Sequence, residues 1–430
     1  MTAAMTSTTS VLETLTSPYL PFDPASDHWS DLIPTPQSES SSPMCPILYN
    51  PSYSSAMDLY RTLTSCHSSC VKNSPLGGLE LSIRALALTS HLIQLNPSHF
   101  SVWQYRANIL LFSPHLEQSI PKSSGDDGRD AVLRSELVWL EQLAHKNMKS
   151  YQVWQHRRVV VSALGDPARE LEFVRENLAR DSKNYHTWGY LQWILAHFGG
   201  LSLLPLAKND SNNDEEKMVV GSKGAGKFAH LWDGQVEYVD MLLKQDCRNN
   251  SAWNHRWYVN FARFGLTGNN SNSSSTLILS KEMKEEMEKK IKYEIAYTKA
   301  NLTNVPNNSS AWNYLRSLHI NLPFPFGTPL IQEFGWIKTL VSTHVEAQED
   351  FKVDIMGRSS IGALEWWLDI IANEINLENS KYDSDHDKVE SLIQEAETLV
   401  KRLIIADGVR KRFWALRLKN IRRSLITTTN

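Results

Sequence analysis

The chain has 430 residues, of which 41% are hydrophobic and 10% aromatic, so it can bury a core in one large domain or in two to three ordinary ones. Its 44 basic and 47 acidic residues leave a net charge of −3, which gives no reason to expect nucleic acid or an anionic membrane as the main partner. A local basic patch could still hold a phosphate. Four cysteines are too few for a disulfide framework, and no apolar run approaches the roughly 20 residues that span a bilayer. We therefore expect a cytoplasmic protein without membrane insertion.

The N-terminal residues 1–17 are rich in Thr and Ser and lack the basic and apolar regions of a secretory signal. We expect residues 1–28 to be a variable, disordered extension and residues 29–430 to form one helical-repeat domain. Further along, Cys66-His-Ser-Ser-Cys70 resembles half of a zinc site, but a second pair of Cys or His at zinc spacing is missing. No metal site is predicted there.

A tryptophan motif recurs five times and organises the middle of the chain, with its copies centred on Trp103, Trp154, Trp188, Trp253 and Trp312. The shortest spacing, from Trp154 to Trp188, is 34 residues, the length of a helix–turn–helix repeat. The longer gaps contain polar insertions near 115–130, 200–228 and 266–280. These stretches cannot bury themselves, so they are predicted to be surface loops.

The spacing within the motif is typical of the start of a helix. Four residues before each Trp stands His99, Ser150, Asn184, Asn249 or Asn308, and Ser and Asn are favoured N-caps. The Trp then falls one turn inside the helix, with an Arg three residues later on the same face, except where Leu191 and Leu315 replace it. We expect a buried indole against a guanidinium to join one hairpin to the next, so these Trp and Arg residues are predicted to be structural.

Amphipathic runs between the motifs, such as 170–178 and 236–243, indicate two antiparallel helices per repeat. Further helices are expected over 362–371, 389–406 and 409–418, whereas strand-like alternation is scarce. The predicted fold class is all-α, a crescent-shaped α-α superhelix (solenoid) of antiparallel helical hairpins.

Residues Gly221–Lys227 have the Gly-x-x-x-x-Gly-Lys spacing of a phosphate-binding loop. Phe228 stands where that motif requires Ser or Thr for Mg²⁺, and the segment lies in an insertion without room for a βαβ unit. A flexible basic loop is the favoured interpretation.

The repeated Asn-Tyr-x-x-Trp-x-x-Arg unit, clearest in Lys149–Arg158 and Asp181–Trp188, resembles the repeat of protein prenyltransferase α subunits. The N-terminal block Trp29–Gln37, with Pro46–Tyr49 and Ala56–Arg61, resembles the first segment of the subunit shared by farnesyltransferase and geranylgeranyltransferase type I, which argues against the related Rab-type subunit. The resemblance runs from about Trp29 to Ser424.

This resemblance implies a crescent of hairpins wrapped around a separate β subunit. The heterodimer would transfer farnesyl or geranylgeranyl, or both, from the prenyl diphosphate to the Cys of C-terminal Cys-a-a-X motifs in protein substrates. Zinc would be held by the β subunit, with magnesium a further candidate ion of the holoenzyme, and this chain alone would bind no metal. The α subunit would stabilise the β subunit and the charge building on the diphosphate leaving group.

The resemblance also assigns residues of the cleft. Lys149 matches the lysine that reaches the diphosphate and assists catalysis, and it precedes a helix N-terminus, where anions are favoured. Tyr151 and Gln152 match positions lining the cleft, and the Gln resembles the ligand of the peptide's terminal carboxylate. An ordinary surface lysine is the alternative for Lys149, with Lys183 at the same repeat position as its rival.

In the next repeat, Asn184, Tyr185 and His186 match cleft residues, with Tyr185 and His186 near the diphosphate. Repeat packing is the alternative for the two aromatic positions and for Tyr151. Gly189–Leu191 departs from the more usual Gln-His-Arg, which puts the packing of this repeat and a cleft contact in doubt. Two alternatives stay open for the whole chain: a Rab geranylgeranyltransferase α subunit, and a non-catalytic scaffold like the tetratricopeptide repeats.

Overall fold

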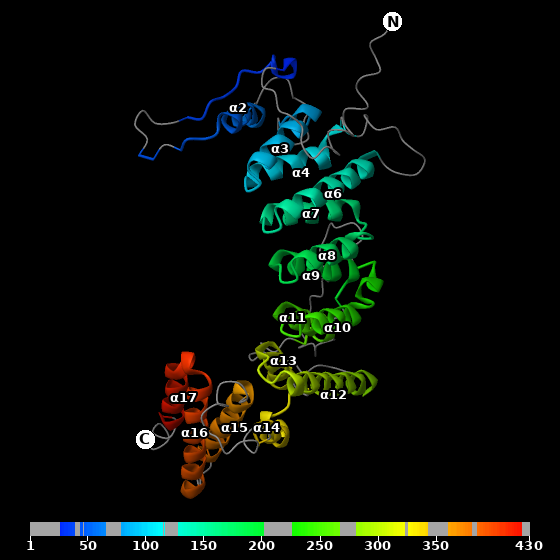
Figure 1. Ribbon diagram of the computed structural model, residues 1–430. Coiled ribbons are helices and arrows are strands. Elements are labelled where there is room, and N and C mark those ends of the chain that lie inside the picture. Colours follow the sequence, from blue (N-terminus) through cyan, green and yellow to red (C-terminus); the bar gives the residue numbers. More distant parts are fainter. Residues whose placement is uncertain are drawn as a thin grey trace, which may run out of the picture. The chain divides into compact units, whose positions relative to one another are not determined.

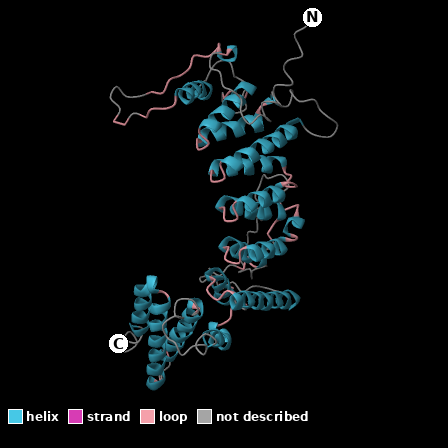
Figure 2. Ribbon diagram, viewed as in Figure 1, coloured by secondary structure: helices cyan, strands magenta, loops and turns pink. Residues whose placement is uncertain are grey.

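The computed structural model describes residues 26–38, 44–45, 47–65, 79–114, 116, 128–201, 226–266, 281–322, 326–342, 360–380 and 385–423. Helices and loops make up these residues, and no strand occurs among them (Figure 2), which confirms the all-α prediction. The predictions for residues 1–25, Cys66–Cys70 and 221–225 lie outside the described residues. So do most of the three insertions, although residues 128–130, expected in a loop, already belong to a helix.

The chain divides into two compact units, the first reaching Gly200 and including Ala229–Trp232, the second running from Asp233. This division does not test the predicted extension over residues 1–28 or the predicted domain over residues 29–430. Both stay predictions. Each unit is described by itself.

Unit 1 consists of antiparallel hairpins in chain order (Figure 1). Its helices are η1 (Asp27–Trp29), α2 (Pro51–Ser65), α3 (Ile83–Leu95), α4 (Phe100–Phe112), α6 (Gly128–Lys146), α7 (Tyr151–Leu164), α8 (Glu170–Arg180), α9 (Tyr185–Gly199) and η2 (Ala229–Trp232). Contacts join the pairs α3–α4, α6–α7 and α8–α9, and the second helices α4, α7 and α9 also contact one another in sequence. The second helices therefore form a continuous layer, as stacked repeats require.

Unit 2 also begins with helical hairpins and then adds further helices. Its elements are α10 (Gln235–Gln245), α11 (Asn250–Asn260), η3 (Ala262–Phe264), α12 (Lys281–Asn304), α13 (Ser309–Ile320), η4 (Leu330–Glu333), α14 (Phe334–Ser342), α15 (Ile361–Asn379), α16 (His386–Ala406), η5 (Gly408–Arg410) and α17 (Lys411–Arg423). The predicted C-terminal helices are confirmed. Helices α15, α16 and α17 pack successively against one another.

Each motif tryptophan closes the turn that precedes its own helix. In all five copies the indole Nε1 donates to the carbonyl six residues earlier, as in Trp103 to Pro97 at 2.8 Å and Trp312 to Pro306 at 2.7 Å. The rings are at most 6% exposed. A phenylalanine could fill the space but could not make this bond, which explains why the motif uses Trp.

The N-cap prediction is confirmed for three of the five copies. The side chains of Asn184, Asn249 and Asn308 accept hydrogen bonds from backbone N–H groups of the first helical turn. Ser150 and His99 also stand at the N-cap positions of their helices, but their side chains make no such bond. The Ser150 hydroxyl instead donates to Gln152 Oε1 at 3.2 Å.

The motif arginines join successive hairpins, but through a buried glutamate and not through the motif tryptophan. Arg157 on α7 donates two bonds of 2.8 Å to Glu170 on α8 and lies 3.6 Å over the ring of Phe173. Arg106 pairs likewise with Glu136 and lies over Trp139. The expected contact between the guanidinium and the motif tryptophan is therefore wrong. The ring beneath each of these two guanidinium groups belongs to the next hairpin.

In three of the five copies the side chain two residues after the motif Trp completes the buried cluster, namely His156, Tyr190 and Tyr314. Tyr190 donates to Glu170 at 2.7 Å, and Tyr314 donates to Glu294, which also pairs with Arg256. Each carboxylate thus receives one partner from the preceding hairpin and one from its own. Such paired, hydrogen-bonded carboxylates can be buried without a large penalty.

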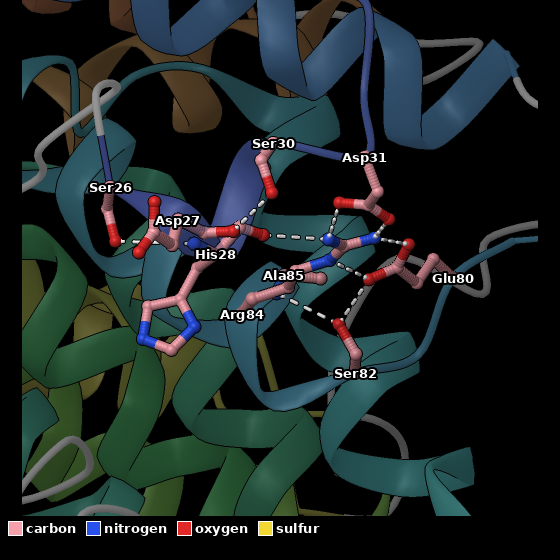
Figure 3. A network of polar contacts seen from close by, with 9 residues as sticks. All are labelled: Ser26, Asp27, His28, Ser30, Asp31, Glu80, Ser82, Arg84 and Ala85. Carbon is pink, nitrogen blue, oxygen red and sulfur yellow. Dashed lines mark hydrogen bonds and ion pairs between the residues drawn. The ribbon is translucent and has the colours of Figure 1, made fainter.

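The N-terminal segment 26–38 is fixed to α3 by a polar network around Arg84 (Figure 3). The guanidinium donates to Asp31 at 2.6 Å, to Glu80 at 2.6 Å and to the His28 carbonyl at 2.8 Å. The ring of Trp29, 8% exposed, lies beneath the guanidinium. Because of the Arg84 bond, the pKa of the Asp31 carboxyl lies below its ordinary value.

Candidate functional site

A groove of about 390 Å³ lies on the layer formed by α4, α7 and α9. Four of the six predicted site residues line it: Tyr151, Gln152, Tyr185 and His186. The remaining lining residues are Phe100, Trp154, Gln155, Arg158 and Gly189. The first residues of successive second helices meet here because the hairpins stack in register.

Three aromatic rings form the wall of the groove. The ring of His186 meets that of Tyr151 edge-on at 4.3 Å between centroids, and that of Tyr185 at 5.5 Å. Both tyrosines are well exposed, at 68% and 75%. Burial lowers the pKa of His186, opposed by a hydrogen bond to the Lys149 backbone, so the imidazole is neutral near pH 7. The exposed rings of Tyr151 and Tyr185 are therefore available to a ligand.

Gln152 is held in place by two neighbours. Its Nε2 donates to the Ser98 carbonyl at 3.0 Å, and its Oε1 accepts from the Ser150 hydroxyl. One amide N–H remains for a ligand, since the group carries two donors.

Asn184 lies beneath the groove and does not line it. It is 3% exposed, and its Oδ1 accepts from the backbone N–H of Thr187 at 3.0 Å. Its Nδ2 donates to the Met148 carbonyl at 3.4 Å and to Asp181. Asn184 thus joins the start of α9 to the turn before α7. This connection positions the aromatic side chains of the groove.

Lys149 lies in that turn, outside the groove lining but next to it, as its backbone bond to His186 shows. The side chain is exposed and forms no ion pair with any described residue. Lys183 occupies the same turn position one repeat later and is also exposed. Lys149 is bonded through its backbone to His186, a lining residue of the groove.

Arg158 and Gly189 are lining residues to which sequence reasoning gave no role. Arg158 is half-buried, lies 5.4 Å over the Trp193 ring and donates to the Gly189 carbonyl at 3.2 Å. Burial lowers the pKa of Arg158, which remains a cation. The spacing of Tyr151, Gln155 and Arg158 along one helical face was the signal that could have found it.

The corresponding positions of α11 and α13 in unit 2 form a second groove of about 270 Å³. It is lined by Asn250, Trp253, Asn254, Trp257, Ser310, Asn313, Tyr314, Ser317 and Asn321. None of these side chains is cationic, whereas the unit 1 groove has Arg158 and the nearby Lys149. An anionic ligand therefore favours the groove of unit 1.

The described residues contain no group of three or more His, Cys, Asp or Glu that could hold a metal ion. They do not fit a zinc site. Among the same residues no helix is both long and apolar enough to cross a membrane.

The sequence was compared with models of known protein families. The family described as "Protein prenyltransferase alpha subunit repeat" matches residues 83–113, 133–164, 167–198, 232–261 and 291–321. These five segments coincide with the hairpins around the five motif tryptophans. The chain belongs to the protein prenyltransferase α-subunit repeat family.

Relatives in this family are named for the enzymes they belong to. The "Protein farnesyltransferase/geranylgeranyltransferase type-1 subunit alpha" of Pisum sativum is 32% identical over 67% of this chain and 65% of its own length. The protein of the same name from Dictyostelium discoideum is 29% identical over 70% of this chain and 71% of its own. The "Geranylgeranyl transferase type-2 subunit alpha" of Rattus norvegicus is 35% identical, but over only 31% of this chain and 22% of its own length.

Proposed function

We propose that this chain is the α subunit of a heterodimeric, cytoplasmic protein prenyltransferase of the farnesyl/geranylgeranyl type 1 class. With a β subunit it would transfer a farnesyl or geranylgeranyl group from the prenyl diphosphate to the Cys of C-terminal Cys-a-a-X motifs. The observation that carries the proposal is the aromatic groove at the starts of α7 and α9, bordered by Lys149. The longer alignments with type 1 relatives support the class.

The groove suits a substrate with an apolar body and an anionic end. Exposed rings of Tyr151 and Tyr185 offer apolar area together with hydroxyl groups. Lys149, which has no competing ion pair among the described residues, supplies a cation at the turn where α7 begins, and the N–H groups of that first helical turn also favour an anion. These groups would stabilise negative charge on the departing diphosphate.

The zinc that such an enzyme uses to make the substrate thiol a thiolate would belong to the β subunit. The contribution of this chain would be binding, orientation and charge. Asn184 would act through the residues it positions, and Gln152 through its remaining amide N–H.

The proposal is tested with the chain co-expressed with each candidate β subunit. Transfer is assayed with both prenyl diphosphates and with Cys-a-a-X peptides that differ at the last residue. Lys149→Ala is expected to lower kcat by about a hundredfold with little change in KM for the peptide, as for loss of one group that stabilises transition-state charge. Lys183→Ala, at the equivalent turn, is the matched control and should keep full activity.

Unchanged turnover of an intact Lys149→Ala heterodimer would show that this lysine is an ordinary surface residue. Failure to co-purify with any β subunit would remove the enzyme assignment and leave a scaffold. The short type-2 alignment supports a second candidate, which predicts that the heterodimer modifies Rab substrates in place of Cys-a-a-X peptides.

A further inference from the structure

The last helix of the chain carries a concentrated positive charge. Residues 408–423, comprising η5 and α17, contain seven Lys and Arg residues and no acidic residue, although the whole chain has a net charge of −3. The seven are Arg410, Lys411, Arg412, Arg417, Lys419, Arg422 and Arg423. Such a segment differs from an ordinary solvated helix, in which both signs alternate.

The inner face of α17 is already occupied, which fixes the face that it exposes. Trp414 is fully buried and donates its Nε1 to Asp407 at 3.0 Å, and Ile421 is 8% exposed. Arg417 pairs with Asp369 of α15, and α17 packs along α16 (Figure 1). The helix is therefore anchored and cannot turn its outer face inward.

Three apolar side chains form a stripe on the outer face. Val409 is 97% exposed, Phe413 43% and Leu416 53%. Their spacing of four and three residues places them in one line along the helix direction. All three side chains are thus at least partly open to solvent.

Cations without partners lie beside this stripe. Arg410, Arg417 and Arg422 are neutralised by ion pairs with Asp407, Asp369 and Glu397. The other four are exposed and form no ion pair with a described residue: Lys411, Arg412, Lys419 and Arg423. Arg412, Lys419 and Arg423 share the flank of the helix next to Leu416.

We propose that this outer face of η5 and α17 docks on a membrane surface that contains anionic lipids, with α17 parallel to the surface. The cations would contact the headgroups while Phe413 and Leu416 enter the boundary between headgroups and acyl chains. A polyanion such as nucleic acid would use the charge but would leave the apolar stripe in water. The attachment is peripheral, and it goes beyond the proposed transferase activity, which does not depend on it.

The test is flotation of the full-length chain, co-expressed with its β subunit, with phosphatidylcholine vesicles that contain or lack phosphatidylserine. The wild type is expected to float only with the phosphatidylserine vesicles, and less at high salt. Arg412→Glu/Lys419→Glu/Arg423→Glu should lower the partition coefficient by at least about a hundredfold, since each lost cation near an anionic surface is worth roughly fivefold. The matched control is Lys281→Glu/Lys289→Glu/Lys292→Glu on α12, which makes the same change in charge among exposed lysines and should bind as the wild type.

A second variant tests the apolar stripe. Phe413→Ser/Leu416→Ser is expected to reduce binding about tenfold while leaving the helical circular dichroism and the prenyl-transfer rate unchanged. Several outcomes would overturn the proposal: no flotation of the wild type, equal flotation with both vesicles, or equal loss in the α12 control. Full binding of the serine variant to the phosphatidylserine vesicles would also overturn it, because the apolar stripe would then take no part. Binding to an RNA duplex but not to vesicles would overturn it as well and assign the surface to a polyanion.

Discussion

At the residue scale, the groove depends on a few positions whose side chains differ from their repeat equivalents. Gly189 is the clearest, because a Cβ built there would meet no atom within 4 Å and the open space belongs to the groove. The departure from the usual Gln-His-Arg thus changes a lining position, while Tyr190 of the same triplet maintains the packing through Glu170. The packing of this repeat is therefore preserved, whereas the lining of the groove is changed at Gly189.

Replacing Gly189 is expected to separate stability from substrate binding. Gly189→Ala should stabilise the chain by about 1 kcal/mol, because it restores helix propensity within α9 without a clash. Gly189→Gln should give a similar stability but fill the groove and raise KM for the peptide several-fold. Thermal unfolding and steady-state kinetics of the heterodimer provide the two measurements. Equal kinetics for the two variants would show that the space at Gly189 is not used by substrate.

At the element scale, the hairpins are joined by repeated carboxylate clusters. One repeat boundary lacks the cluster and allows a comparison within the chain. Where Leu191 replaces the motif arginine, the following repeat has Gln235 at the position of Glu136, Glu170 and Glu294. Loss of the cation thus coincides with loss of the anion. This is the pattern expected if a buried carboxylate is tolerated only with its guanidinium.

Arg157→Leu should therefore destabilise the chain by about 3–5 kcal/mol, since it leaves Glu170 buried without a cation. Adding Glu170→Gln should recover more than half of that loss, because the amide oxygen can still accept the Tyr190 hydroxyl. The double-mutant cycle is measured by urea unfolding of the purified chain. Additive losses in the two single variants would contradict a coupled pair.

At the scale of the whole molecule, buried titratable groups determine how the chain responds to acid. The Glu136 carboxyl is fully buried, which would raise its pKa, but Arg106 and His156 outweigh that and lower the pKa to about 2. The contribution of this carboxylate is present above about pH 4.5 and is lost as the pH falls toward 2. His255 in unit 2 behaves differently, because burial alone lowers its pKa from 6.5 to about 3.

His255 should make unit 2 sensitive to mild acid. The unfolded chain binds a proton near pH 6.5 whereas the folded chain does not until about pH 3, so the contribution is complete above 6.5 and decreases below it. The expected loss between pH 7 and pH 5 is about 2 kcal/mol. Hydrogen exchange of the α11 amides at both pH values, corrected for intrinsic rates, measures it. His255→Gln, which cannot titrate, should remove most of this dependence; an equal dependence in the variant would refute the assignment.

The sequence by itself determined the all-α class and the hairpin repeat, because the Trp motif contains its own turn, cap and core residue within about ten positions. It also identified the residues that open α7 and α9, since these occupy fixed places in the motif. The tertiary structure decided what lies across the hairpin boundaries. The partner of each arginine is a glutamate 13 to 38 residues away, a separation that loop length sets and periodicity does not reveal.

The same reason explains the site. Tyr151 and His186 are 35 positions apart in the chain and meet only because α7 and α9 stack in register, and Arg158 and Gly189 became lining residues through that stacking. Asn184 matches a cleft residue in the sequence pattern, but its hydrogen bonds turn it inward to Met148 and Thr187. A repeat pattern fixes which face of a helix a residue occupies, whereas packing of the neighbouring hairpin decides whether that face is open to a ligand.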